Sequence, residues 1–155
     1  MKLDWKKLLL YLAIPISAGG LAALLSGGMD TYSTLKQPPL SPPGWIFPLV
    51  WTILYLLMGY ASYRIATSDA PESQRKNALT FYGVQLFLNF LWPIVFFRLQ
   101  WYWAAFILLV ILWIFIYITM YCFETIDETA ENLLIPYLLW VTFAGYLNLG
   151  VALLN

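Results

Sequence analysis

The chain has 155 residues, of which 62% are hydrophobic and 10% charged, whereas an ordinary soluble domain has about 45–50% and about 25%. This composition excludes a typical water-soluble globule and indicates a membrane protein. The formal net charge is zero, so nucleic acid is not expected as a partner. There is no histidine, which removes the usual general base and the commonest metal ligand.

Five stretches of the chain carry no formal charge and are long enough to cross a bilayer. A bilayer core about 30 Å thick needs about 20 apolar residues in helical form, which satisfies the backbone hydrogen bonds within the segment. The sequence therefore predicts a single all-α integral membrane domain over residues 1–155, folded as a five-transmembrane-helix bundle. The predicted helices cover about 8–28, 45–64, 77–97, 101–123 and 132–154, with a long loop over about 29–44.

The first predicted helix follows several lysines, as a secretory signal would, but it is too long for a signal and is expected to be retained. It is rich in small residues that allow a second helix to approach closely, either within the chain or in a second copy. An oligomer is therefore expected. The small residues are Ala18, Gly19, Gly20, Ala22, Ala23, Gly27 and Gly28.

The loop over 29–44 ends in a proline-rich run, which prevents the second helix from starting before about Trp45. A loop of this length over a small bundle is typical of a lid or a pocket wall. In the second helix, Trp51 lies one turn before Tyr55 on the same stripe, and about two turns from the helix start. This stripe is compatible with helix packing, with the aromatic belt at the membrane surface or with a ligand pocket.

The third and fifth helices each carry one face with both amide and aromatic side chains. An amide within the bilayer is expected to face a cavity or a partner helix, and Trp92 and Phe96 continue the stripe of Gln85 and Asn89, which favours a cavity. In the fifth helix, the small Ala144 leaves space for either a helix or a ligand. The residues of this second face are Tyr137, Trp140, Ala144 and Asn148.

The distribution of basic residues predicts the orientation. Lys and Arg gather near the N-terminus and in the 64–76 loop, whereas the opposite side has only Lys36 and Arg98. The positive-inside rule then places the N-terminus in the cytoplasm and the C-terminus outside.

The sequence contains no pattern typical of hydrolytic catalysis, a metal site or a cofactor. The carboxylates gather near the predicted membrane surfaces, and Ser and Thr have no histidine partner. The single cysteine, Cys122, has no second thiol with which to form a redox pair or a zinc site. We therefore predict neither a metal nor a resident cofactor.

Four motifs occur in order along the chain: KQPPLSPPG at 36–44, VWTILY at 50–55, NFLWPIVFF at 89–97 and PYLLWVTFAGYLN at 136–148. Together they resemble the TspO family of tryptophan-rich sensory proteins, whose animal members are the translocator proteins. The resemblance implies a five-helix bundle, commonly a homodimer, with a pocket for tetrapyrroles such as protoporphyrin IX and for isoquinoline carboxamides. The implied ligand-binding residues are Tyr32, Pro42, Trp51, Tyr55, Asn89, Pro93, Phe96, Trp140, Ala144 and Asn148.

The leading hypothesis is a membrane receptor or sensor in which a flat ligand stacks between Trp51 and Trp140 while Asn89 orients a polar edge. The absence of histidine favours a metal-free porphyrin over haem. A second hypothesis is an enzyme that degrades protoporphyrin with light and oxygen, with Trp51 and Trp140 as the oxidisable groups. A third is a porphyrin or lipid transporter.

The resemblance has one clear departure. The animal members carry a sterol-associated motif ending in Lys or Arg in the last helix, whereas Arg98 is the last basic residue here. Specific sterol binding is therefore not predicted. The missing motif and the positive-inside bias favour a bacterial cytoplasmic membrane.

Overall fold

A computed structural model describes residues 2–27 and 32–155, and within these residues all regular structure is helical. The long helices are α1 (Trp5–Leu25), α2 (Ile46–Ala66), α3 (Glu72–Pro93), α4 (Tyr102–Glu124) and α6 (Ile135–Leu154), and the short ones are η1 (Tyr32–Thr34), η2 (Ile94–Arg98) and α5 (Glu128–Leu133). Five spans are long and apolar enough to cross a membrane, with α3–η2 and α5–α6 each counted as one span. The predicted fold class is confirmed. Residue 28 of the first predicted helix and residues 29–31 of the predicted loop lie outside the described residues.

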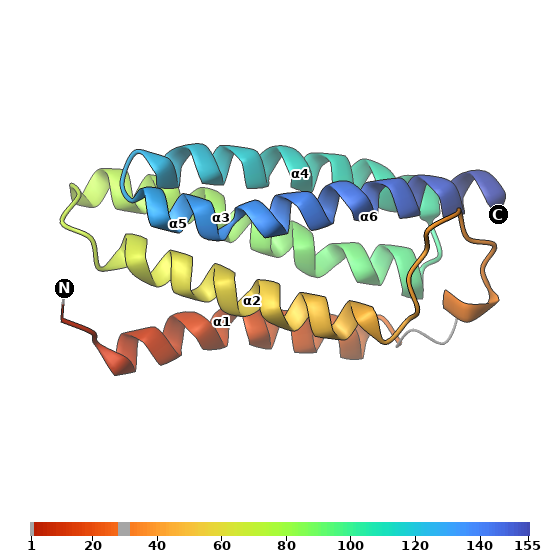
Figure 1. The fold of residues 1–155 in the computed structure, drawn as a ribbon, viewed down its shortest axis with the longest axis horizontal. Coiled ribbons are helices and arrows are strands. Elements are labelled where there is room, and N and C mark those ends of the chain that lie inside the picture. Colours follow the sequence, from red (N-terminus) through yellow and green to blue (C-terminus); the bar gives the residue numbers. More distant parts are fainter. Residues whose placement is uncertain (1, 28–31) are drawn as a thin grey trace.

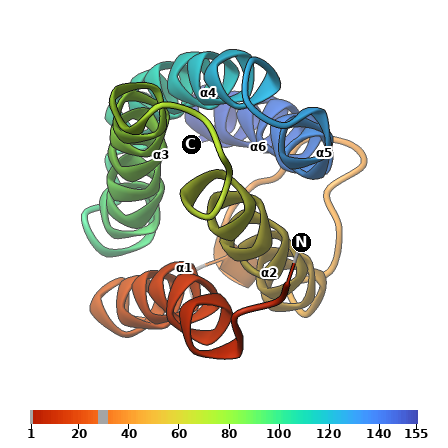
Figure 2. The same ribbon diagram turned by 90° about the vertical axis from the view of Figure 1, so that its left-hand side faces the viewer.

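The bundle has two ends that differ in character. The N-terminus and α5 lie at one end, and the C-terminus and the loop between α1 and α2 lie at the other, here called the loop end (Figure 1). Looking along the bundle, α1 lies beside α2, and α3 lies beside α4 (Figure 2). α1 also contacts α3, and α4 contacts α6. The predicted orientation across the membrane stays a prediction.

Several helices extend beyond the charge-free stretches from which they were predicted. α1 begins at Trp5 because Asp4 caps it, accepting a hydrogen bond from the Lys7 N–H at 3.3 Å. α3 begins at Glu72, five residues before the expected start, and its first turn carries a Glu72–Lys76 ion pair of 3.2 Å. A charge-free stretch therefore predicts the membrane-spanning part of a helix but not its ends, because polar and charged turns can extend the helix beyond that stretch.

Two of the membrane-spanning helices are interrupted next to a proline. Pro136 has no N–H to donate, and the last predicted helix is divided at Leu134 into α5 and α6. After Pro93, the backbone widens into the π-helical turn η2, where the Leu99 N–H donates to the Ile94 carbonyl at 3.0 Å. This turn carries Phe96 and Phe97, so it sets the direction of both rings.

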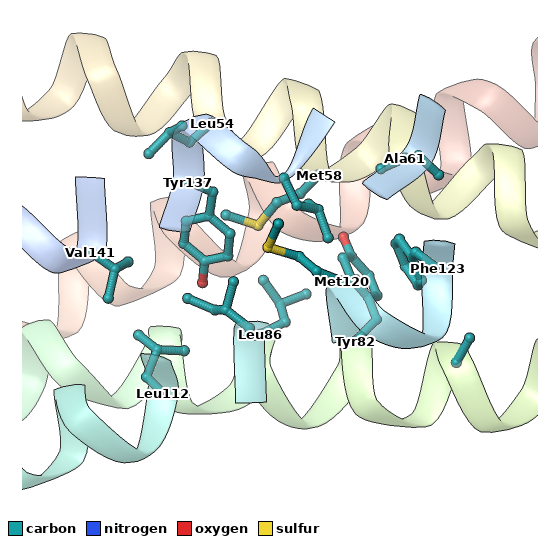
Figure 3. Close-up of a cluster of buried hydrophobic side chains, with 14 of the residues drawn as sticks. Leu54, Met58, Ala61, Tyr82, Leu86, Leu112, Met120, Phe123, Tyr137 and Val141 are labelled. Atoms are coloured by element: carbon teal, nitrogen blue, oxygen red, sulfur yellow. The ribbon is translucent and has the colours of Figure 1, made fainter. Parts of the chain in front are cut away.

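A cluster of buried hydrophobic side chains from α2, α3, α4 and α6 forms the packed core (Figure 3). Met58 of α2 and Ile116 and Phe123 of α4 have no exposed surface, and they belong to this one buried cluster. α1 packs closely on α2 because Gly59 has no side chain. A Cβ atom at Gly59 would lie 2.8 Å from both the Leu12 Cα and the Tyr11 carbonyl oxygen. A smaller buried cluster at the loop end consists of Phe96, Ala105 and Val151.

One ion pair ties α2 to the turn before α5. The Arg64 Nε donates to Asp127 Oδ2 at 2.7 Å, and a second guanidinium nitrogen donates to Oδ1 at 3.3 Å. Burial raises the pKa of Asp127, but the hydrogen bond and the charge of Arg64 outweigh this effect and hold the pKa below its usual 3.8. Asp127 also caps α5 by accepting from the Thr129 N–H at 3.0 Å.

The Asp127→Asn variant is expected to lower the free energy of unfolding by about 1 kcal/mol at pH 7. Asparagine keeps a cap for α5, so the difference reports the ion pair. Because the folded pKa of Asp127 is depressed, its stabilisation is present at neutral pH and is lost as the pH falls through that folded pKa. Thermal unfolding of both proteins in detergent at neutral and acidic pH tests this; a difference that persists unchanged in acid would contradict it.

Candidate functional site

A cavity of about 360 Å³ occupies the loop end of the bundle. It lies among the last turns of α1 and α3, the first turns of α2, the second half of α6 and the loop before α2. Its volume falls within the range of about 300–1,000 Å³ that is usual for small-molecule pockets. Its lining consists of Ile16, Gly19, Gly20, Ala22, Ala23, Ser26, Tyr32, Gln37, Ser41, Phe47, Pro48, Trp51, Thr52, Tyr55, Asn89, Trp92, Pro93, Phe96, Phe97, Ala144, Leu147, Asn148 and Val151.

Aromatic rings contributed by α2 form one wall of the cavity. Trp51 and Tyr55 are one helical turn apart, and their rings stack with centroids 5.6 Å apart. Tyr137 lies behind them, with its ring edge-to-face against Trp51 at 6.2 Å. Because its ring is held by these neighbours, Trp51 presents a fixed aromatic surface to the cavity.

A second aromatic wall comes from the end of α3 and from η2. The Trp92 and Phe96 rings stack at 5.1 Å, and Phe97 lies edge-to-face against Phe96 at 4.8 Å. The Phe96 ring is in turn supported by Tyr102 at 5.0 Å. The π-helical turn therefore places two consecutive phenylalanines, Phe96 and Phe97, on the same cavity.

The small residues of α1 form a further wall. Gly20, Ala22 and Ala23 line the cavity, and a Cβ atom at Gly20 would meet no atom within 4 Å. Gly19 instead provides room for the Tyr55 ring, which a Cβ atom at that position would overlap. The internal helix contact allowed by the sequence is thus present at Gly19, and the neighbouring small residues line space for a ligand. Gly28 lies outside the described residues.

A chain of buried hydrogen bonds leads from the cavity into the core. The Tyr55 hydroxyl donates to Asn89 Oδ1 at 2.9 Å, and Asn89 Nδ2 donates to the Tyr137 hydroxyl at 2.8 Å. The Tyr137 hydroxyl donates to Gln85 Oε1 at 2.6 Å. Gln85 therefore connects helices and does not line the cavity, whereas Asn89 does both. This chain fixes the Asn89 amide before any ligand arrives.

Asn148 links the second aromatic wall to α6 in the same way. Its Oδ1 accepts from Trp92 Nε1 at 3.0 Å, and its Nδ2 donates to the Tyr102 carbonyl at 2.9 Å. The side chain is buried, with 1% of its surface exposed, and it also borders the cavity. The indole of Trp92 is consequently held in one orientation by a hydrogen bond as well as by stacking.

The loop before α2 covers the cavity and is attached to α6. The Tyr32 hydroxyl donates to the Pro42 carbonyl at 2.8 Å, and burial raises the pKa of this hydroxyl. The Tyr146 hydroxyl donates to the Pro39 carbonyl at 2.6 Å. Gly150 allows the Pro38 ring to sit on α6, because a Cβ at Gly150 would overlap that ring. The loop is thus a pocket wall with a defined position.

Most of the predicted binding residues come together at this cavity. Tyr32, Trp51, Tyr55, Asn89, Pro93, Phe96, Ala144 and Asn148 all line it. Pro42 and Trp140 do not. Pro42 acts through its carbonyl, which holds Tyr32.

Trp140 lies on the side of α6 that faces α2. Its ring packs edge-to-face against Phe47 at 5.8 Å, and it borders a separate apolar groove between the two helices. The structure therefore does not place the Trp51 and Trp140 rings on opposite sides of one cavity, because Phe47 supplies the cavity surface in this region. Of the two tryptophans that the oxidative hypothesis names as oxidisable groups, only Trp51 lines the cavity.

The arrangement suits one kind of ligand. Rings on two walls, small residues on a third and two fixed amides form an apolar site with few polar groups, which is how small-molecule pockets are generally built. Within residues 2–27 and 32–155, no group of His, Cys, Asp or Glu is placed to hold a metal ion. The site can bind a flat hydrophobic molecule through ring contacts.

A family model described as the TspO/MBR family matches residues 10–154. The chain belongs to the TspO/MBR family. It is similar to the tryptophan-rich sensory protein of Cereibacter sphaeroides, with 37% identity over 100% of this chain and 95% of that protein. It is also similar to the tryptophan-rich protein TspO of Chlorobaculum tepidum, with 40% identity over 80% of this chain and 78% of the relative. The translocator protein of Bos taurus shares 33% identity over 93% of this chain and 87% of its own.

Family membership and the five apolar helices together make this TspO/MBR protein an integral membrane protein. The relatives include proteins of bacteria, an archaeon, a yeast and mammals, so membership does not select one kind of membrane. The bacterial membrane, the orientation and the homodimer stay predictions.

Proposed function

We propose that this TspO/MBR protein is a membrane receptor that binds a tetrapyrrole, with metal-free protoporphyrin IX as the test ligand, in the cavity at the loop end. The observation that carries this proposal is the presence of two supported aromatic walls, at Trp51 and at Trp92 with Phe96, on one cavity. Ring contacts of this kind add about 0.5–1.5 kcal/mol each beyond the burial of apolar area.

The polar groups of the cavity agree with such a ligand. Asn89 and Asn148 both line the cavity and are fixed by protein partners, and each amide has one further N–H and lone pairs that a ring nitrogen or a polar substituent could use. No histidine is present to ligate iron, so the metal-free ring is the better match. The names of the relatives, sensory protein and translocator protein, agree with a role in sensing or moving a small molecule.

Replacing Trp51 with alanine is expected to weaken protoporphyrin binding about tenfold, because one stacking surface is lost. The measurement is a titration of the detergent-purified protein in the dark, following the porphyrin absorption band. Trp101→Ala is the matched control, because Trp101 is 60% exposed and does not line the cavity. Trp140→Ala is expected to have a smaller effect than Trp51→Ala.

Two results would contradict the assignment. Binding that never saturates in the wild type would mean that porphyrin only partitions into the micelle. Equal losses for Trp51→Ala and Trp101→Ala would mean that the rings of the cavity are not the binding surface.

A further inference from the structure

We propose that Arg98, which lies next to residues of the cavity wall, binds a carboxylate of the ligand, so that the natural ligand is an anionic amphiphile and not merely a flat hydrophobic molecule. This inference rests on the function proposed above. It adds a charged anchor beside a site whose lining residues carry no charge.

The position of Arg98 follows from its neighbours. Phe97, which precedes it, lines the cavity. On the other side, a Cβ at Gly27 would lie 3.7 Å from Arg98 Nη1, and Ser26, which precedes Gly27, also lines the cavity. The guanidinium therefore lies where η2 approaches the end of α1, next to two lining residues.

The charge of Arg98 is not balanced by an acidic side chain within the part of the chain that the structure describes. The ion pairs found there involve Arg64 and Lys76 and lie toward the opposite end. The described side-chain carboxylates are all in segments at that opposite end; they are Asp4, Asp69, Glu72, Glu124, Asp127, Glu128 and Glu131. The Arg98 side chain is exposed, so its donors remain available to a ligand.

The chemistry of the guanidinium selects the partner. Its planar fork of N–H donors matches a carboxylate, and such charge-assisted bonds are about twice as strong as neutral ones. A ring held between the aromatic walls can direct an acidic substituent toward the rim, where the charge stays close to water. The apolar part of such a ligand would be buried while its carboxylate avoids the cost of desolvation deep in the bundle.

If Arg98 had only a structural role, a different result would be expected. A cation beside the C-terminus of α1 also interacts favourably with the helix dipole. In that case, removing the charge would lower the thermal stability of the protein and leave the affinities for charged and uncharged ligands in the same ratio.

The test compares protoporphyrin IX, which carries two propionates, with its dimethyl ester, which has the same ring and no acidic group. In an uncharged detergent, Arg98→Gln is expected to weaken binding of the diacid about tenfold and to leave binding of the ester unchanged. Arg98→Lys should retain most of the affinity for the diacid. Rising salt should weaken binding of the diacid to the wild type but not binding of the ester.

Lys36→Gln is the matched control. Lys36 is the other cation at the loop end, but its main chain is bonded to the Asn155 side chain on α6, with N···Oδ1 at 3.2 Å. Equal losses for Lys36→Gln and Arg98→Gln would indicate general attraction to this end of the bundle and would overturn the Arg98 site. An unchanged ratio of diacid to ester affinity in Arg98→Gln would also overturn it while leaving the proposed function intact. A wild type that binds neither porphyrin would overturn both proposals.

Discussion

Gly20→Leu is expected to reduce porphyrin binding about thirtyfold, because the new side chain would occupy space that a bound ring needs. Gly20 lines the cavity, and a Cβ there meets no atom within 4 Å, so the substitution does not collide with the protein itself. Leucine also favours a helix over glycine by up to about 1 kcal/mol, so the fold should be no less stable than in the wild type. Titration in the dark and thermal unfolding of the same sample separate the two effects.

Gly83→Leu is the matched control for this substitution. Gly83 is in α3 and is exposed, and a Cβ at this position would also meet no atom within 4 Å, but Gly83 does not line the cavity. The variant should gain the same helix propensity and bind porphyrin like the wild type. If Gly20→Leu binds equally well, the ligand does not occupy this cavity.

Tyr137→Phe is expected to lower the free energy of unfolding by about 2 kcal/mol. The hydroxyl accepts from Asn89 Nδ2 and donates to Gln85 Oε1, and both amides are buried, so its loss leaves a donor and an acceptor unpaired. This value is at the lower end of the range expected for two lost hydrogen bonds, because polar groups of the unfolded chain also find hydrogen-bond partners in a micelle. Thermal or denaturant unfolding in detergent measures the change.

Tyr121→Phe is the control for the loss of a hydroxyl, since Tyr121 is 65% exposed. Tyr55→Phe should have a smaller effect than Tyr137→Phe, because it removes only the first bond of the chain, to Asn89 Oδ1. A Tyr137→Phe protein as stable as the wild type would show that this hydrogen-bonded chain does not hold α3 and α6 together.

Helical periodicity selected most of the residues that meet at the cavity, but it could not identify which neighbour each face meets. Trp140 and Ala144 are four residues apart on one face of α6, yet Ala144 borders the cavity while Trp140 packs against Phe47. One face of α6 borders both the cavity and the α2 helix. A small difference in the direction of two side chains on that face therefore decides which of the two each one meets. No pattern in the sequence indicates this division.

Other residues of the lining were missed for similar reasons. Phe47 lies one turn before Trp51 on the same stripe but directly after the proline-rich run, so it was not recognised as part of the site, and Phe97 reaches the cavity only because the backbone widens after Pro93. The small residues of α1 predict close helix contacts, but a small side chain beside a cavity has the same signature in sequence as one beside a helix. The proline-rich loop did indicate a pocket wall, because a long connection over a small bundle must lie across its end.

The sequence by itself determined the five membrane spans, because a bilayer requires long apolar helices and tolerates few alternatives. It also determined the order of the motifs that identify the TspO/MBR family, and the pairing of amides with aromatic rings on α3. Only the tertiary structure decided how the helices turn toward one another: which rings share the cavity, which small residues leave it open, and that the Arg98 guanidinium lies beside Gly27. These features depend on helix rotation and on a π-helical turn, which arise from packing among distant segments and not from any local pattern.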